Sequence, residues 1–465
     1  MAHRPGFSGW WGLLALTPLL ASVAGSGRLP WLVLAATIAA TGASFPMFEG
    51  VLPVLPWAFL PLVVAFVPQV LLPVLAWRRL GGHGGGPPAA LAAASAWLLC
   101  ESVARAPLWG SLAGFYSLGY SQFDTALLGL ARLSGPGLIS FVLVLCGGAL
   151  AQLRSRDFRS VLVCGLLAPP LLLLASPGPK AAPGSVQQHV TLVQPAFSSL
   201  EFELARTDQE AAEAQARKLA LLGVNPAPAQ LMVWPETVLS PLVRPGFVTG
   251  LLRADTALIA GRVETAGPRS YNSVMLPGAW GWESVQRKVV PVPVIEWPEL
   301  SPGGAGATLA LPGMKVLGAL VCLDSAHAWP ALRAARSGAD LLVVLSNSEF
   351  AVASQTPELH LRVSAFRAVE LGVPVAFSAS SGPSALIDPH GRVHARTTVG
   401  AQTALTLPVP DRLESTPYLR AGDWFSWLAG PVLLLLVPGL RFRGPRGCGA
   451  VRSSRSGRRA RASRN

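Results

Sequence analysis

Charged side chains are scarce in this chain. Asp, Glu, Lys and Arg make up 13% of its 465 residues, whereas half of the residues are apolar. Mean hydropathy is +0.46, while charged residues supply about a quarter of an ordinary soluble domain. The shortage of charge excludes a typical soluble enzyme and predicts a membrane protein.

Cysteine is also rare, with five in the chain. Cys100, Cys146 and Cys164 lie in apolar stretches and Cys448 lies in the C-terminal tail. Cys322 is therefore alone in the one long polar region. Because a disulfide needs two cysteines in one compartment, we expect Cys322 to carry a free thiol.

Long apolar stretches are abundant and predict a helical membrane part. Most approach the roughly 20 residues that a bilayer requires, and in lipid such segments must be helical. We expect about six transmembrane helices in residues 1–176 and one more at 424–440. The stretches lie at about 9–26, 29–46, 51–77, 88–106, 133–153, 158–176 and 424–440.

Basic residues predict how the chain crosses the membrane. Nine Arg and no acidic residue occupy the tail 441–465, so most of the formal charge of +13 is local. A basic tail directly after a span is typical of a cytoplasmic segment rather than of a nucleic-acid-binding one. Arg78, Arg79 and Arg154 mark further cytoplasmic loops by the same rule, which places residues 177–423 outside the cytoplasm.

Residues 177–423 differ from the rest of the chain in their hydrophobic pattern, which predicts one α/β domain. Short β-rich runs alternate with helical patterns, which favours a layered fold. A Pro/Gly-rich linker at 177–184 leads into the domain. Strands are expected near 188–194, 229–233, 256–263, 315–321, 340–345, 374–379 and 403–408, and helices at about 199–222, 326–337 and 357–371.

Three side chains of this domain form a candidate catalytic set. Glu236 follows an apolar strand that we expect to end at Pro235, and a buried carboxylate there is able to take a proton from a thiol. Cys322 follows another apolar run, at a strand-to-helix turn whose backbone N–H groups favour a thiolate and an oxyanion. Lys288 precedes a Pro-broken apolar stretch and is placed to stabilise negative charge on a carbonyl oxygen.

Each of these residues also has a purely structural interpretation. Glu236 is compatible with a helix-initiating acid, Cys322 with a core residue, and Lys288 with a surface lysine. Glu101 and Arg105, four residues apart, likewise suit an ion pair on one helix face. Taken singly, none of them decides a function.

The order Glu236, Lys288, Cys322 resembles the Glu-Lys-Cys triad of the nitrilase superfamily. The flanking spans narrow the resemblance to the apolipoprotein N-acyltransferase family within it. Further short motifs of that family recur along the chain. They are Glu101-x-x-x-Arg105, Gly119-Tyr120-Ser121-Gln122, Val193-Gln194-Pro195, Tyr271-Asn272-Ser273, Leu345-Ser346-Asn347, the run from Arg367 to Pro374, and the run from Ile387 to Gly391.

The resemblance implies a multi-span α-helical membrane domain joined to an α-β-β-α sandwich, in the bacterial inner membrane with the catalytic domain in the periplasm. It implies that Cys322 takes a fatty acyl chain from a phospholipid such as phosphatidylethanolamine. The thioester then passes the chain to the N-terminal amine of diacylglyceryl-cysteine in an apolipoprotein. Glu236 is the implied base, and Lys288 with the Leu323 N–H the implied oxyanion donors. No metal, cofactor or nucleic acid is implied, and the protein is expected to be a monomer.

Several positions depart from the family pattern. Leu323 and Asp324 follow the cysteine where Tyr-Glu is usual. The family's Asn-Asp-x-Trp-Phe motif becomes Asn347-Ser348-Glu349-Phe350, which loses an aspartate and a tryptophan. Glu296 keeps the family's eight-residue offset from Lys288. The resemblance carries over Glu296, Leu323, Asp324 and Asn347 as supporting residues of the site.

Two other functions stay open at this point. One is a membrane-tethered amidase or nitrilase-type hydrolase, with water as the acceptor. The other is a catalytically silent paralogue that binds lipoprotein. Trp297, Pro298 and Leu300 form an apolar loop that is a candidate either for dipping into lipid or for packing on the domain.

Overall fold

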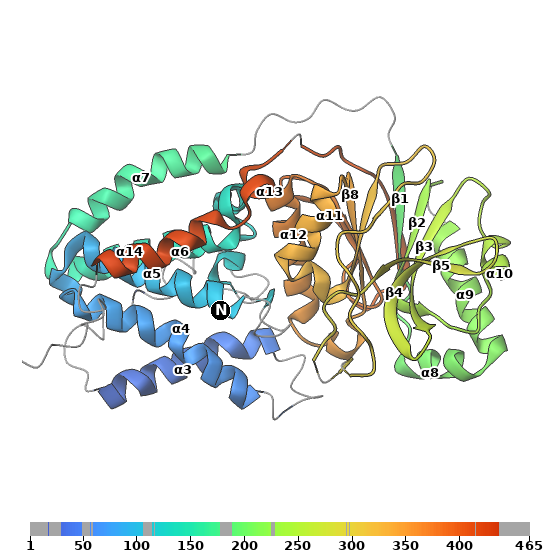
Figure 1. Ribbon diagram of the computed structural model, residues 1–465, viewed down its shortest axis with the longest axis horizontal. Helices are drawn as coiled ribbons and strands as arrows, with labels where there is room; N and C mark the ends of the chain where they lie inside the picture. Colours follow the sequence, from blue (N-terminus) through green and yellow to red (C-terminus); the bar gives the residue numbers. More distant parts are fainter. Residues whose placement is uncertain are drawn as a thin grey trace, which may run out of the picture.

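The computed structural model has a helical part and an α/β part (Figure 1). It describes residues 17, 29–48, 56, 59–105, 114–115, 117–176, 188–224, 228–293, 295–296, 298–413 and 415–436. The linker at 177–184, the tail at 441–465, Trp297 and the expected span at 9–26, except residue 17, lie outside the described residues.

The helical part is built from the apolar segments of the sequence. By length and composition, one helix among the described residues, Ala126–Ser155, is long and apolar enough to cross a membrane. Pro136 lies inside that segment, beside a kink at Ser134 and Gly135. The α-helices are α3 (Leu29–Phe48), α4 (Phe59–Arg79), α5 (Gly86–Ala104), α6 (Ala131–Gln152), α7 (Arg159–Ala175) and α14 (Ala429–Leu436).

Two sheets, each of six described strands, face one another in the α/β part. The first has the order β12-β1-β2-β3-β4-β5 and the second the order β11-β10-β9-β8-β7-β6. The first contains β1 (His189–Gln194), β2 (Leu231–Leu239), β3 (Ala257–Ala266), β4 (Arg269–Pro277), β5 (Trp282–Arg287) and β12 (Thr403–Pro408). The second contains β6 (Thr308–Leu309), β7 (Leu317–Val321), β8 (Leu341–Ser346), β9 (Val375–Ala379), β10 (Ala385–Ile387) and β11 (Val393–Arg396).

Parallel pairing in the middle of each sheet brings strand ends together. β1, β2 and β3 run parallel to one another, as do β7, β8 and β9. Aliphatic side chains from both sheets, among them Val233, Ile259, Val321 and Val343, form one core between them. Such buried parallel strands read as continuous apolar runs, which is why the sequence shows them clearly.

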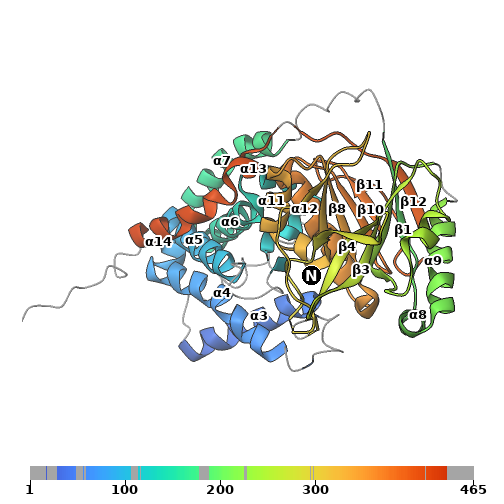
Figure 2. The ribbon, with the colours of Figure 1, turned by 45° about the vertical axis from the view of Figure 1, so that its right-hand side comes forward.

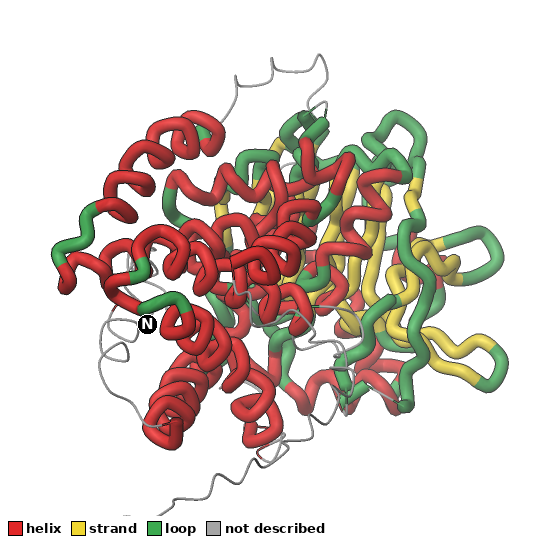
Figure 3. The backbone as a smooth tube through the Cα atoms, turned by 60° about the vertical axis from the view of Figure 1, so that its left-hand side comes forward, coloured by secondary structure: helices red, strands yellow, loops and turns green. Residues whose placement is uncertain are grey.

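Helices cover the outer face of each sheet. α8 (Ser199–Thr207), α9 (Gln209–Val224) and α10 (Pro245–Thr249) lie on the first sheet, and α11 (Ala328–Arg336) and α12 (Thr356–Leu371) on the second. α11 and α12 stand between the sheets and the helical part (Figures 1 and 2), and the strands lie to one side of the helical part (Figure 3). The layers therefore run α-β-β-α, with the helical part beyond α12.

The helical part and the α/β part share a hydrophobic core. Leu359, Val363 and Phe366 of α12 belong to the same buried cluster as Leu128 and Ile139 of the helical part. Tyr120 packs edge-on against Phe366, with ring centroids 4.9 Å apart. Both faces of α12 are buried as a result, which explains its uniformly buried sequence.

The expected elements are confirmed at the level of strands and helices. All seven expected strands are present, and the expected helix at 199–222 is two helices that meet at Asp208. Strands β4, β5, β6, β10 and β11 were not expected. The expectation that β2 ends at Pro235 is wrong, because the strand continues to Leu239 with an irregularity between Trp234 and Leu239.

Candidate active site

The irregular stretch of β2 presents Glu236 between the two sheets. Pairing with β1 stops at Val233, and the residue after Glu236, Thr237, has a left-handed φ of 52°. Gly261 of β3 makes room for this stretch, because a Cβ there would lie 2.4 Å from the Glu236 Cα. The glutamate is 3% exposed. It is thus a buried carboxylate within a strand, and the alternative of a helix-initiating acid is wrong.

Cys322 stands at the turn that follows β7. Its φ of 48° is left-handed, a conformation that costs a non-glycine residue about 1–3 kcal/mol and is enriched at functional sites. A short 3-10 turn, Cys322–Ser325, leads from the strand into α11. The thiol is half-buried and hydrogen-bonds to the Glu236 carboxylate. Cys322 is therefore at the expected strand-to-helix turn, where it also packs against the core between the two sheets.

Lys288 comes directly after β5 and points into the same space. Its Nζ donates to the Glu236 Oε1 at 2.9 Å and to the Glu296 Oε1 at 2.9 Å. The lysine is 2% exposed, so the interpretation as a surface lysine is wrong. Glu296 is held in turn by the backbone N–H of Val292 at 2.7 Å. One ammonium group therefore joins two carboxylates.

Two asparagines complete the hydrogen bonding of Glu236. The Asn272 Nδ2 donates to Glu236 Oε1 at 2.7 Å and to Glu296 Oε1 at 2.9 Å. The backbone N–H of Asn347 donates to Glu236 Oε2 at 2.7 Å, and its side-chain Nδ2 donates to the Thr237 hydroxyl at 3.2 Å. Both oxygens of the base are thus fixed, which sets the direction of the carboxylate toward Cys322.

Burial and charge set the protonation of the three residues. Burial raises the pKa of Glu236, against the lowering effect of Lys288. Burial also raises the pKa of the Cys322 thiol above its usual value, and the charge of Glu236 adds to this rise. Burial disfavours the ammonium of Lys288, but Cys322, Glu236 and Glu296 outweigh it and hold the pKa well above its usual range. The resting site is therefore a neutral thiol beside a carboxylate whose basicity is raised.

Asp324 ties the Cys322 turn to the Lys288 loop. Its carboxylate is fully buried. It accepts hydrogen bonds from the backbone N–H of Val289 at 3.0 Å, of Val290 at 2.8 Å and of Val321 at 3.1 Å. Burial raises the pKa of Asp324 to about 7. The acid that follows the cysteine by two positions therefore works as a brace between two loops.

The structure brings together Glu236, Lys288, Cys322 and the supporting residues Glu296, Asp324 and Asn347. The Leu323 side chain packs in the core shared with the helical part. Leu300 is attached to β4 by a bridge to Ser270, and Pro298 is exposed. Asn272 was missed as a site residue, although its Tyr-Asn-Ser motif had been noted and was the one available signal.

Residues 189–418 match the family model of the carbon–nitrogen hydrolases. An apolipoprotein N-acyltransferase from Azotobacter vinelandii is 32% identical over 418 residues, which cover 81% of this chain and 78% of the relative. This chain belongs to the apolipoprotein N-acyltransferase family. A second member, from Pseudomonas putida, is 32% identical over 402 residues, which cover 79% of this chain and 77% of the relative.

Two solved structures similar to this apolipoprotein N-acyltransferase family member belong to the nitrilase superfamily. An amidase from Nesterenkonia AN1 has 21% identity and a TM-score of 0.38, over 54% of this chain and 98% of that one. A nitrilase-superfamily protein from Saccharomyces cerevisiae has 18% identity and a TM-score of 0.39, over 58% of this chain and 100% of that one.

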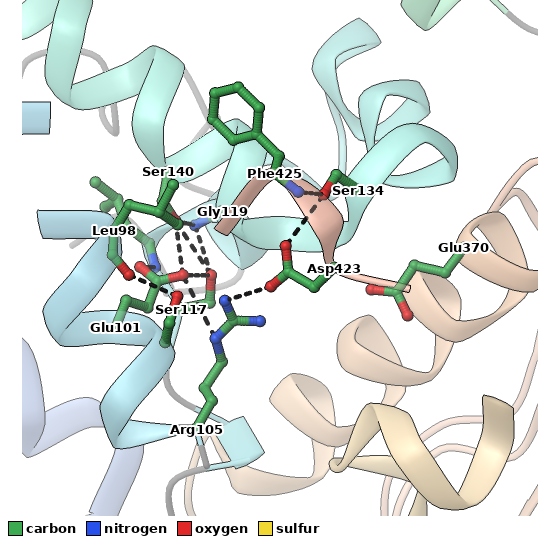
Figure 4. Close-up of polar contacts among 12 residues, drawn as sticks. Leu98, Glu101, Arg105, Ser117, Gly119, Ser134, Ser140, Glu370, Asp423 and Phe425 are labelled. Carbon is green, nitrogen blue, oxygen red and sulfur yellow. Dashed lines mark hydrogen bonds and ion pairs between the residues drawn. The ribbon is translucent and has the colours of Figure 1, made fainter. Parts of the chain in front are cut away.

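A second buried polar cluster lies in the helical part of this family member (Figure 4). Glu101 accepts hydrogen bonds from the Ser117 hydroxyl at 2.5 Å and the Ser140 hydroxyl at 3.0 Å. Arg105 lies 3.8 Å from Glu101 and 3.0 Å from Asp423, beside η10 (Trp424–Leu428). The Glu101/Arg105 pair is thus present, as expected, and extends to the segment that leads back into α14.

Proposed function

We propose that this protein transfers a fatty acyl chain from a phospholipid to the N-terminal amine of diacylglyceryl-cysteine in apolipoproteins, with Cys322 as the nucleophile. The observation that carries this proposal is that Glu236 hydrogen-bonds to both Lys288 and Cys322, within a member of the apolipoprotein N-acyltransferase family.

The first half-reaction loads the enzyme. Glu236 takes the thiol proton as the Cys322 sulfur attacks the carbonyl carbon of a phospholipid ester. The oxyanion that forms is stabilised by the Lys288 ammonium and the Leu323 N–H. The carbon–oxygen bond then breaks, the leaving alkoxide takes the proton from Glu236, and a lysophospholipid departs. Cys322 is left as a thioester.

The second half-reaction transfers the acyl chain from Cys322 to the acceptor. The α-amine of the lipidated cysteine attacks the thioester carbon, and Glu236 takes the amine proton. The carbon–sulfur bond breaks, the acyl chain leaves as an amide, and the proton returns to the sulfur. Because Asn272 and the Asn347 N–H hold Glu236 in one place, the same carboxylate serves both halves.

A membrane placement follows from the substrates. Both the acyl donor and the acceptor are lipids, so the thiol must reach the bilayer surface. We propose that the helical part and α14 are multi-pass transmembrane segments of the bacterial inner membrane. The basic tail 441–465 then lies in the cytoplasm and the α/β part in the periplasm. We further propose that the protein acts as a monomer.

The test is mass spectrometry of Cys322 after the full-length protein is incubated with phosphatidylethanolamine vesicles. We expect the mass of one acyl chain on the Cys322 peptide. Addition of a diacylglyceryl-cysteine peptide should remove that mass and yield the acylated peptide. Cys146→Ser is the matched control, because it removes a thiol of the helical part and leaves Cys322 in place.

The outcomes separate the three candidate functions. Acylated peptide formed at the normal rate by Cys322→Ser would refute Cys322 as the nucleophile. Loss of the thioester to water, with no acylated peptide and with hydrolysis of a soluble amide, would support a membrane-tethered amidase instead. An unlabelled Cys322 in a folded protein that binds the lipopeptide would support a silent lipoprotein-binding paralogue.

A further inference from the structure

His360 of α12 lies beneath the catalytic turn, outside the set of residues that contact Glu236. It is 2% exposed, and its ring is held edge-on between Phe115 of the helical part and Phe377 of β9. The ring centroids lie 5.4 Å and 5.0 Å away, respectively. Burial lowers the pKa of His360 to about 4, so the imidazole is neutral at physiological pH.

One ring nitrogen holds the Cys322 turn. His360 Nε2 lies 2.9 Å from the Cys322 carbonyl oxygen and 2.7 Å from the Ser325 hydroxyl. A carbonyl oxygen only accepts, so Nε2 carries the proton. The Ser325 hydroxyl donates to the same carbonyl at 3.0 Å. Two donors therefore fix the carbonyl of a residue whose φ is left-handed.

The other ring nitrogen holds the end of β8. The neutral Nδ1 is an acceptor, 3.3 Å from the Ser346 hydroxyl. One imidazole thus links the Cys322 turn to the end of β8. The residue that follows β8, Asn347, donates its backbone N–H to Glu236.

We propose that His360 is a positioning residue that sets the Cys322 turn against the strand end holding Glu236. The inference rests on the proposed role of Cys322 as nucleophile. The imidazole touches no reacting atom and acts through two backbone segments. Because a misplacement of about 1 Å is able to cost about a hundredfold in rate, loss of this link should slow reaction at the thiol more than it weakens substrate binding.

The experiment compares full-length His360→Ala, His360→Gln and Phe377→Leu in detergent. Gln keeps an N–H donor that reaches the Cys322 carbonyl, and Phe377→Leu disturbs the same packing without removing a hydrogen bond to that turn. The first readout is the rate of Cys322 carbamidomethylation by iodoacetamide, followed by mass spectrometry of the Cys322 peptide. The second is kcat and KM for acyl transfer from phosphatidylethanolamine.

We expect His360→Ala to lower the carbamidomethylation rate and kcat by about tenfold or more, with KM within about twofold of wild type. His360→Gln should recover both to within about threefold, and Phe377→Leu should lower the unfolding temperature while Cys322 stays reactive. Equal reactivity of His360→Ala and wild type would overturn the proposal. So would an equal loss in Phe377→Leu, or no recovery in His360→Gln.

Two further outcomes remain distinguishable. If His360→Ala gives no folded protein, Ser346→Ala decides, because it removes only the Nδ1 partner. Slower labelling of Cys322 supports the proposal and unchanged labelling overturns it. If wild type is alkylated rapidly but transfers no acyl chain, the proposed function fails, while the alkylation rates still decide the role of His360.

Discussion

Replacing Asp324 by Asn tests the brace between the two catalytic loops. The carboxylate is fully buried and accepts three backbone N–H groups on two oxygens. An amide has one acceptor oxygen, so Asp324→Asn must turn its NH₂ toward one of these donors. The facing backbone N–H and the Asn NH₂ are then both buried donors without an acceptor. Each costs about 1–3 kcal/mol, which gives about 2–6 kcal/mol for the two. For a domain of this size we expect a fall in unfolding temperature of about 4–24 °C.

The assay is thermal unfolding at pH 8, where the Asp324 carboxyl is ionised, together with acylation of Cys322 by phosphatidylethanolamine. Acylation should slow by about tenfold to a hundredfold, because the Lys288 loop is no longer fixed to the Cys322 turn. Asp324→Glu is the control. It keeps the carboxylate but overfills the site, so it should cost about 1–3 kcal/mol and retain more activity than the Asn variant. Wild-type stability and acylation in Asp324→Asn would refute the brace.

Two further predictions concern a close contact and a buried acid. Gly261→Ala should slow Cys322 acylation by about a hundredfold or more, because its Cβ would lie 2.4 Å from the Glu236 Cα. Gly246→Ala is the control, because a Cβ there would lie in open space. Equal acylation rates in Gly261→Ala and wild type would contradict this prediction. Burial raises the pKa of Glu370 to about 7, above its unfolded value, so folding takes up a proton and stability is lost as pH rises through 7. Glu370→Gln should therefore show a smaller fall in unfolding temperature than wild type between pH 5 and pH 8, and an identical fall would count against this role.

The central strands could be predicted because they are buried on both faces. β7 and β8 read as unbroken apolar runs, and the turn after β7 placed Cys322 correctly. β4 and β5 could not be recognised in the same way. β5 consists mostly of polar residues, and Gln286 is the one buried residue of its six, so its sequence resembles that of a loop. Its position depends on antiparallel pairing with β4, which no local pattern reports.

The cluster of Glu236, Lys288 and Cys322 was predictable in its members more than in its geometry. The order of Glu236, Lys288 and Cys322 and their motifs pointed to one site. Asn272 faces Glu236 only because β3 and β4 pair in a particular register, with Val263 opposite Asn272. The number of transmembrane helices stays a prediction, because one helix among the described residues meets the length and hydropathy needed to span a bilayer.

The position of α12 bears on whether the α/β part is able to fold as an isolated, soluble fragment. Its inner face packs on the second sheet, and its outer face carries Leu359, Val363 and Phe366 into the core shared with the helical part. A fragment cut out at residues 189–418 would present that outer face to water as a contiguous apolar surface, which promotes self-association. To become independent, the fragment would need polar substitutions along one side of a single helix. The α/β layers therefore depend on the helical part to cover the outer face of α12.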